Sequence, residues 1–130
     1  MRSSIADQCA TWSPRALSLL RIVSAYLFLL HGIVKAGGAE FDLFSLMGLA
    51  ATIEILGGIM ILVGSFTRIA AFVSSGEMAF AYFMGHASKG APLLPVFNGG
   101  DAAILFCFVF LYLAVTGPGP WSIDAMRNTT

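Results

Sequence analysis

The sequence consists of long apolar blocks with very few charged residues between them. Hydrophobic residues occupy 58% of the 130 positions and charged residues 11%, and the mean hydropathy is +0.85. A water-soluble domain of this length needs more charge to cover its surface, so lipid is the expected solvent. Because a helix needs about 20 mostly apolar residues to cross the hydrocarbon, the chain has room for four spans. We therefore predict an all-α fold, a bundle of four transmembrane helices in one domain.

The breaks between the apolar blocks set the expected helix boundaries. Glycine, proline and polar residues cluster in the breaks, and such clusters end helices. They predict helices over residues 16–34, 46–63, 69–85 and 101–115. These helices make a transmembrane domain of residues 16–116, between an N-terminal tail of residues 1–15 and a C-terminal tail of residues 117–130. Pro14 is expected at the entry to the first helix, since proline is tolerated in a first turn.

The lysines and arginines in the short flanks predict the orientation. Basic residues are enriched on the cytoplasmic side of membrane proteins. With the N-terminus inside, the cytoplasmic basic residues are Arg2, Arg15, Arg68 and Arg127, and the outer ones are Lys35 and Lys89. This bias favours N-in and C-in topology, with both tails in the cytoplasm.

Ionisable residues inside the apolar blocks are the main functional signal, because a charge in hydrocarbon needs a partner or a water-filled cavity. Arg21, His31 and Lys35 share one face of the first predicted helix. Glu54 and Glu77 lie on faces of small residues in the second and third helices, which allow close packing. Depths estimated from a rise of about 1.5 Å per residue predict two pairs, Arg21 with Glu77 and His31 with Glu54.

These pairs have three interpretations. They can be structural, as buried ion pairs or hydrogen bonds that fix which helix faces which, with Arg21 and Glu77 as the main ion pair. Alternatively, His31, Glu54 and Glu77 line a polar pocket open to the outside, for a quinone headgroup or a small polar molecule. A proton relay is the third interpretation.

Further polar residues gather at the outer end of the predicted bundle. The candidate pocket residues are His31, Lys35, Glu54, His86, Asn98 and Asp101. The two histidines lack a metal-binding spacing such as HxxxH, so interfacial residues that meet water are the simpler account and no metal site is predicted. Asp101 is expected to cap the fourth helix, because its carboxylate favours the positive helix end. Cys9 and Cys107 share no motif and are expected to be free thiols.

Several short motifs, taken together, resemble the DoxX family of small four-helix membrane proteins. The resemblance spans residues 21–124 and is carried by Arg21, His31, Gly32, Lys35, Glu54, Gly57, Gly58, Thr67, Arg68, Pro95, Asn98, Gly99, Asp101, Gly119, Ser122 and Asp124. Where the family pattern often has Glu after the paired glycines, this chain has Asp101. The resemblance implies a multi-pass protein of the bacterial inner membrane, linked to quinone-dependent oxidation of sulfur compounds and to thiol or oxidative-stress systems.

Two functional hypotheses follow. The first is a noncatalytic subunit or scaffold that docks a redox enzyme, since the sequence has no CxxC, no haem-ligating histidine pair, no nucleotide-binding loop and no other catalytic motif. The second is a small transporter or enzyme that uses the polar interior, with quinone as the candidate cofactor. A wet cavity reaching Glu54 would favour the second, whereas dry and paired side chains favour the first. The expected partners are the bilayer, a redox-enzyme subunit and a second copy of the chain; without a basic run, nucleic acid is not expected.

Overall fold

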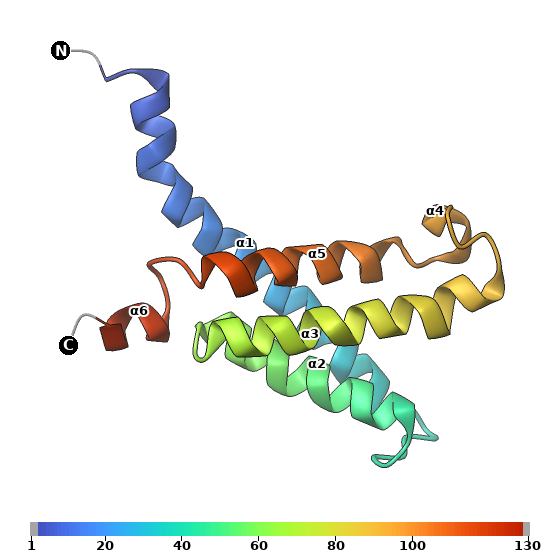
Figure 1. Ribbon diagram of the computed structural model, residues 1–130. Helices are drawn as coiled ribbons and strands as arrows, with labels where there is room; N and C mark the ends of the chain where they lie inside the picture. Colours follow the sequence, from blue (N-terminus) through green and yellow to red (C-terminus); the bar gives the residue numbers. More distant parts are fainter. Residues whose placement is uncertain (1–2, 129–130) are drawn as a thin grey trace.

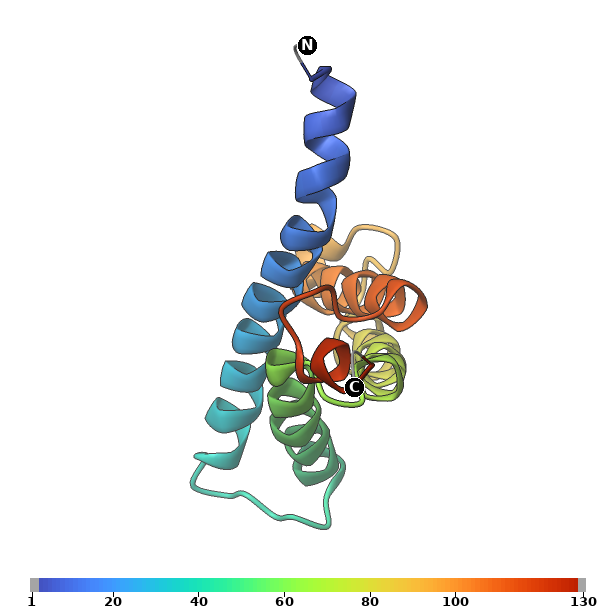
Figure 2. The ribbon, with the colours of Figure 1, turned by 90° about the vertical axis from the view of Figure 1, so that its left-hand side faces the viewer.

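The computed structural model describes residues 3–128, and every regular element in that part of the chain is a helix, which confirms the all-α class. The body consists of α1 (Ile5–Ala36), α2 (Leu46–Val63), α3 (Thr67–Ala81) and α5 (Asp101–Thr116). α1 packs along α2, α3 packs along α5, and α2 also contacts α3. Figure 1 shows α3 and α5 side by side, and Figure 2 shows α1 and α2 running together past them.

The connecting segments gather at two ends of the bundle. Residues 37–45 and 82–100 lie at one end, on the right of Figure 1, which we call the loop end. The turn at residues 64–66 and residues 117–128, which include α6 (Ile123–Asn128), lie at the other end, which we call the C-terminal end. Because the turn between α2 and α3 is short, these two helices lie antiparallel and next to each other.

α1 begins much earlier than predicted. Ser4 and Asp7 form a capping box, in which the Asp7 backbone N donates to Ser4 Oγ at 3.2 Å and the Ser4 backbone N donates to the Asp7 carboxylate at 3.0 Å. This satisfies free N–H groups of the first turn and allows the helix to start at Ile5. Pro14 therefore lies inside α1, at the cost of one backbone hydrogen bond. The predicted start near residue 16 is wrong, and the first turns of α1 project beyond the bundle (Figure 1).

The other helices lie close to their predicted bounds. α2 covers the predicted residues 46–63, and α5 ends one residue later than predicted, at Thr116. α3 has 15 residues and continues into a π-helix of 5 residues, η1 (Tyr82–His86), followed by the 3-10 turn η2 (Ala87–Lys89). Within the segment predicted as loop, α4 (Pro95–Asn98) is one further helical turn.

Large apolar side chains cover the outside of the bundle, and small or polar residues are frequent inside it. Phe72 and Leu105 are 65% and 67% exposed, whereas Arg21, Glu54 and Ser74 are buried. Two helices of the described chain, α1 and α2, are long and apolar enough to cross a membrane; α5 is apolar but shorter. This distribution suits a lipid solvent better than water.

Glycine and aromatic residues set the packing between helices. A Cβ at Gly57 would lie 2.7 Å from Ser74 Oγ, and one at Gly58 would lie 3.0 Å from Leu29 Cβ, so both glycines permit close helix approach. The rings of Phe106 and Phe110 on α5 pack against a phenylalanine of α1, Phe28, with centroid distances of 5.6 and 4.7 Å. The small-residue faces expected on α2 and α3 are thus at helix contacts.

Candidate functional site

Lys35 of α1 and Glu54 of α2 form an ion pair inside the bundle. Lys35 Nζ donates to Glu54 Oε1; the Glu54 side chain is 1% exposed and that of Lys35 is 26% exposed. Gly32, nearly one turn before Lys35, brings the helices together, because a Cβ there would lie 2.8 Å from Glu54 Cβ. The predicted partner of Glu54, His31, is wrong: the flexible lysine side chain reaches back from the end of α1, while His31 turns outward.

Glu77 of α3 completes an acidic and basic cluster with this pair. Ser74, nearly one turn from Glu77, lies against Gly57, nearly one turn from Glu54, because a Cβ at Gly57 would lie 2.7 Å from Ser74 Oγ. Glu77 is therefore at the level of the ion pair, where the charges of Glu54 and Lys35 act on it. Glu77 Oε2, Glu54 Oε2 and Ser74 Oγ are buried and have no hydrogen-bond partner within residues 3–128. We call Lys35, Glu54, Ser74 and Glu77 the interior cluster. Three helices contribute to it, so it joins α1, α2 and α3.

Arg21 contacts the C-terminal segment and not Glu77, so the predicted ion pair between them is wrong. Arg21 Nη1 donates to the backbone oxygen of Pro118 at 2.5 Å, and Nη2 donates to that of Trp121 at 2.6 Å. The residue is 1% exposed. The physical reason is that the segment after α5 folds back under α1 and offers carbonyl oxygens within reach, whereas Glu77 sits with Lys35 and Glu54.

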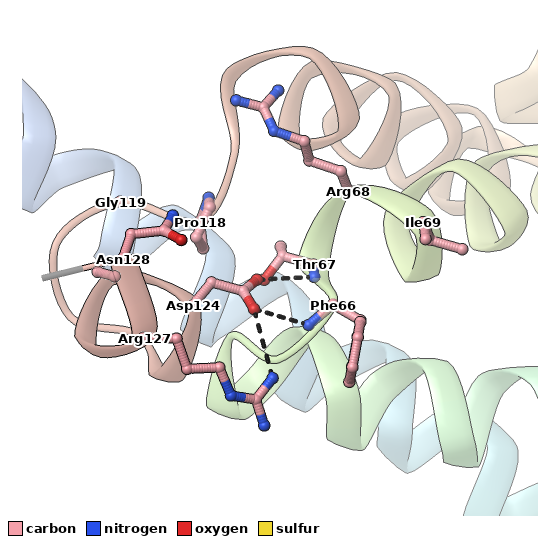
Figure 3. Close-up of a pocket in the computed structure, with 10 residues that line it drawn as sticks. Phe66, Thr67, Arg68, Ile69, Pro118, Gly119, Asp124, Arg127 and Asn128 are labelled. Carbon is pink, nitrogen blue, oxygen red and sulfur yellow. Dashed lines mark hydrogen bonds and ion pairs between the residues drawn. The ribbon is translucent and has the colours of Figure 1, made fainter. Parts of the chain in front are cut away.

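The C-terminal segment is therefore folded onto the bundle. Its Asp124, on α6, accepts hydrogen bonds from the Phe66 backbone N at 2.9 Å, the Thr67 backbone N at 2.9 Å and Thr67 Oγ1 at 2.8 Å. These contacts cap the start of α3, as Figure 3 shows. Burial raises the pKa of Asp124, but the hydrogen bonds from Thr67 and Phe66 and the charge of Arg127 outweigh burial and hold the pKa below its ordinary value.

A pocket of about 540 Å³ opens beside this contact. Its lining consists of Phe66, Thr67, Arg68, Ile69, Pro118, Gly119, Asp124, Ala125, Arg127 and Asn128. Arg68 donates to the backbone oxygens of Ala114 and Val115 at the end of α5. Arg127 donates to Ser65 Oγ at 3.1 Å, and its guanidinium lies 5.1 Å from the Phe66 ring centre. The two arginines flank the Asp124–Thr67 contact (Figure 3), so the pocket has a basic border.

His86 and Asn98 meet at the loop end. His86 Nδ1 lies 3.2 Å from the Asn98 backbone oxygen. The Asn98 side-chain amide donates to Tyr82 Oη at 3.2 Å and to the Ala91 backbone oxygen at 3.2 Å. Tyr82 Oη in turn donates to the Pro92 backbone oxygen at 2.6 Å. These bonds hold the connection between α3 and α5 in shape.

The two remaining predicted pocket residues, His31 and Asp101, have local contacts. His31 is exposed; its Nδ1 lies 2.8 Å from the Leu27 backbone oxygen and its ring packs edge-on against Phe106. Gly100 and not Asp101 is the N-cap residue of α5, but Asp101 lies in the first turn, where its carboxylate accepts from the Ala102 backbone N at 3.1 Å and faces the positive helix end as expected. The Asn98 side-chain oxygen accepts from the Gly100 backbone N at 2.9 Å, just before α5 begins at Asp101.

The described residues contain no group of three His, Cys, Asp or Glu side chains placed to hold a metal ion. Cys9 is exposed and Cys107 half-buried, and both are free thiols as predicted. The predicted pocket residues thus form separate groups: Lys35 joins Glu54, and His86 joins Asn98.

Comparison with known proteins covers the elements that carry the interior cluster. The DoxX family matches residues 16–87, more than half of the chain. This chain belongs to the DoxX family. A relative from Haemophilus influenzae, described as an uncharacterized protein, is 43% identical over 124 residues, which cover 87% of this chain and 91% of the relative. No solved structure matches the chain. DoxX proteins are membrane proteins, in agreement with the apolar outer surface.

The contact between the C-terminal segment and the bundle is the part of the site that sequence reasoning missed. Thr67 and Asp124 are 57 positions apart, so no local pattern links them. A signal was present, because the resemblance in the sequence included Thr67, Arg68, Gly119 and Asp124, and the family match covers the first two of them. Some polar residues of this resemblance lie beside the short turn between α2 and α3, and others lie after α5. This combination indicates that the two segments are in contact.

Proposed function

We propose that this DoxX protein is a four-span protein of the bacterial inner membrane, with both ends in the cytoplasm, and a noncatalytic subunit or scaffold of a redox system linked to quinone or thiols. The spans are α1, α2, α3 with η1, and α5, within residues 16–116. α3 and η1 form a continuous helical run close to the about 20 residues that a span needs. α5, with 16 residues, is shorter than a full span, which a locally thinner bilayer accommodates at modest cost.

The observation that supports a scaffold is the closed interior at Glu54. Its side chain is 1% exposed and already ion-paired, so a ligand would have to displace Lys35. The C-terminal end, by contrast, presents a folded surface with a pocket bordered by Arg68 and Arg127. Arginines held by hydrogen bonds form a preorganised basic border, which suits an acidic surface of a docked enzyme.

Photo-crosslinking in the native membrane tests this proposal. A photoreactive residue at Asn128 lines the C-terminal pocket, and one at Leu93, which is 90% exposed at the loop end, is the matched control. We expect Asn128 to crosslink a redox enzyme and Leu93 not to do so, with the same enzyme retained after purification in mild detergent. Crosslinking from Leu93 instead, or no redox protein at either position, would contradict the proposal.

Quinone binding is the second candidate, because an apolar groove runs beside the interior cluster. The groove has a volume of about 340 Å³ and is lined by Leu27, Leu30, His31, Val34 and Lys35. Lys35 therefore links the groove to Glu54. If quinone binds here, Glu54→Gln should keep the fold and lower the quinone extracted from the purified protein. In a scaffold, the same change should lower the melting temperature and leave quinone content unchanged.

A further inference from the structure

The interior cluster contains more acid than base. Its ionisable members are Lys35 on α1, Glu54 on α2 and Glu77 on α3. From α5, the Cys107 thiol lies opposite Ser75, and at η1 the Tyr82 hydroxyl donates to a backbone oxygen. Neither adds positive charge. If both carboxyl groups were ionised, a single ammonium would leave one negative charge uncompensated between Glu54, which is buried, and Glu77, which is half-buried, and this is unfavourable.

The cluster also contains buried oxygen atoms that have no hydrogen-bond partner in the described chain. Glu54 Oε2, Glu77 Oε2 and Ser74 Oγ lack hydrogen-bond partners among the described residues, and Glu54 and Ser74 are 1% and 0% exposed. Buried polar atoms are nearly always hydrogen-bonded, so these three atoms mark a place where a water molecule, an ion or an added proton would find partners.

The three unpaired atoms belong to faces that are in contact. Ser74 is nearly one turn from Glu77 on α3, and Gly57 is nearly one turn from Glu54 on α2. Because a Cβ at Gly57 would lie 2.7 Å from Ser74 Oγ, the acidic faces of the two antiparallel helices meet at this level.

We propose that the interior cluster is a proton-binding site in which Glu54 and Glu77 share one exchangeable proton beside Lys35. The proton comes from water, adds to one carboxylate to form a neutral carboxylic acid, and returns to water on release. While bound, it removes the surplus negative charge and supplies an O–H donor for an unpaired oxygen. Two carboxylates at one site disfavour double ionisation for the same reason. This site is independent of the docking function proposed above.

Infrared difference spectroscopy of the protein in lipid bilayers, in H₂O and in D₂O, tests the site. At neutral pH we expect a deuterium-sensitive carbonyl band of a protonated carboxyl group. Glu77→Gln should abolish the band. Glu54→Gln should abolish it as well, because Lys35 can then neutralise the remaining acid. Glu40→Gln, which changes an exposed carboxyl group in the loop after α1, is the matched control and should retain it.

Further measurements keep the proposal testable if a glutamine variant does not fold. Lys35→Met leaves two acids without a base, so its band should be about twice as strong as that of the parent. An apolar carbodiimide, which modifies protonated carboxyl groups, should label Glu54 or Glu77 in the parent protein and leave Glu40 unlabelled. A parent protein without the band at neutral pH, a band that Glu54→Gln leaves unchanged, or a band abolished by Na⁺ at constant pH would overturn the proposal.

Discussion

At the scale of single residues, Arg21 is a buried cation whose hydrogen-bond acceptors are two backbone carbonyl oxygens. The planar guanidinium presents several N–H groups in a fixed fork, and the oxygens of Pro118 and Trp121 accept from its two terminal nitrogens. Asp124 adds attraction at longer range. Arg21 thus fixes the C-terminal segment to α1, and the free energy it contributes to folding does not depend on Glu77.

The first prediction concerns this anchoring. Arg21→Ala should lower the free energy of unfolding by about 3 kcal/mol, because hydrogen bonds to a charged group contribute about 1.5–3 kcal/mol each and the loss is partly relieved by water. Chemical unfolding in detergent measures the change. In a double-mutant cycle, Arg21→Ala and Glu77→Gln should be additive within about 0.5 kcal/mol. A coupling energy well above about 0.5 kcal/mol would show that Arg21 and Glu77 interact directly, in contradiction to the structure.

The second prediction concerns Asp124. Its pKa is lowered in the folded state, so its stabilisation is present at pH values above the unfolded pKa and is lost as the pH falls through the folded pKa. Asp124→Asn should cost about 1–2 kcal/mol at neutral pH, through weaker bonds to Phe66 and Thr67. The difference in stability between parent and variant should shrink below about pH 4. Melting curves over a pH series measure it, and a difference that grows toward low pH would contradict the assignment.

At the scale of elements, the turn between α2 and α3 holds the C-terminal end together. Gly64 ends α2 with φ +71, a left-handed conformation. A Cβ at Gly64 would lie 2.3 Å from Ser122 Cβ and 2.9 Å from Arg21 Nη1, and the Gly64 backbone oxygen accepts from the Asp124 backbone N at 2.8 Å. One glycine therefore brings α1, the turn and α6 into contact.

The third prediction follows from this contact. Gly64→Ala should destabilise the protein by about 2 kcal/mol or more, since the left-handed conformation and the clash add. Gly76→Ala is the matched control, because a Cβ there meets nothing within 4 Å in the described chain. That control should leave stability unchanged or raise it by up to about 1 kcal/mol, as alanine is the better helix former. Equal melting temperatures for the two variants would contradict the close contact.

The helices could be predicted from the sequence far better than the contacts between their side chains. α2 carries its own boundary signals, with Ser45 as N-cap and Gly64 as C-cap, and its bounds matched. Depth estimates resolve about one helical turn, however, and a lysine side chain spans that distance, so they could not distinguish Lys35 from His31 as the partner of Glu54. The bond from Arg21 to Pro118 joins positions 97 apart and uses a backbone acceptor, which no charge pattern reveals.

At the scale of the whole molecule, two polar regions are separated by an aromatic one. Arg21 and Asp124 belong to the C-terminal end, and Lys35 belongs to the interior cluster. Phe28 lies midway between Arg21 and Lys35 on α1 and packs against Phe106 and Phe110 of α5. Because Lys35 is the partly exposed member of the ion pair and lies in the last turn of α1, the loop end is the side from which we propose that the interior cluster exchanges its proton. If the loop end faces outward, the proposed proton exchanges with the outside.

The fourth prediction determines which side of the membrane the loop end faces. Four arginines against two lysines favour a cytoplasmic C-terminal end. The probes are single cysteines in a background of Cys9→Ser and Cys107→Ala, placed at exposed positions: Lys89 at the loop end, Arg68 at the C-terminal end and Ser3 before α1. A membrane-impermeant maleimide added to intact cells should label Lys89→Cys, and should label Arg68→Cys and Ser3→Cys after permeabilisation. The reverse labelling pattern would show the opposite orientation, in which the proposed proton exchanges with the cytoplasm. Labelling of both Ser3→Cys and Lys89→Cys in intact cells would show that α1 does not cross the bilayer.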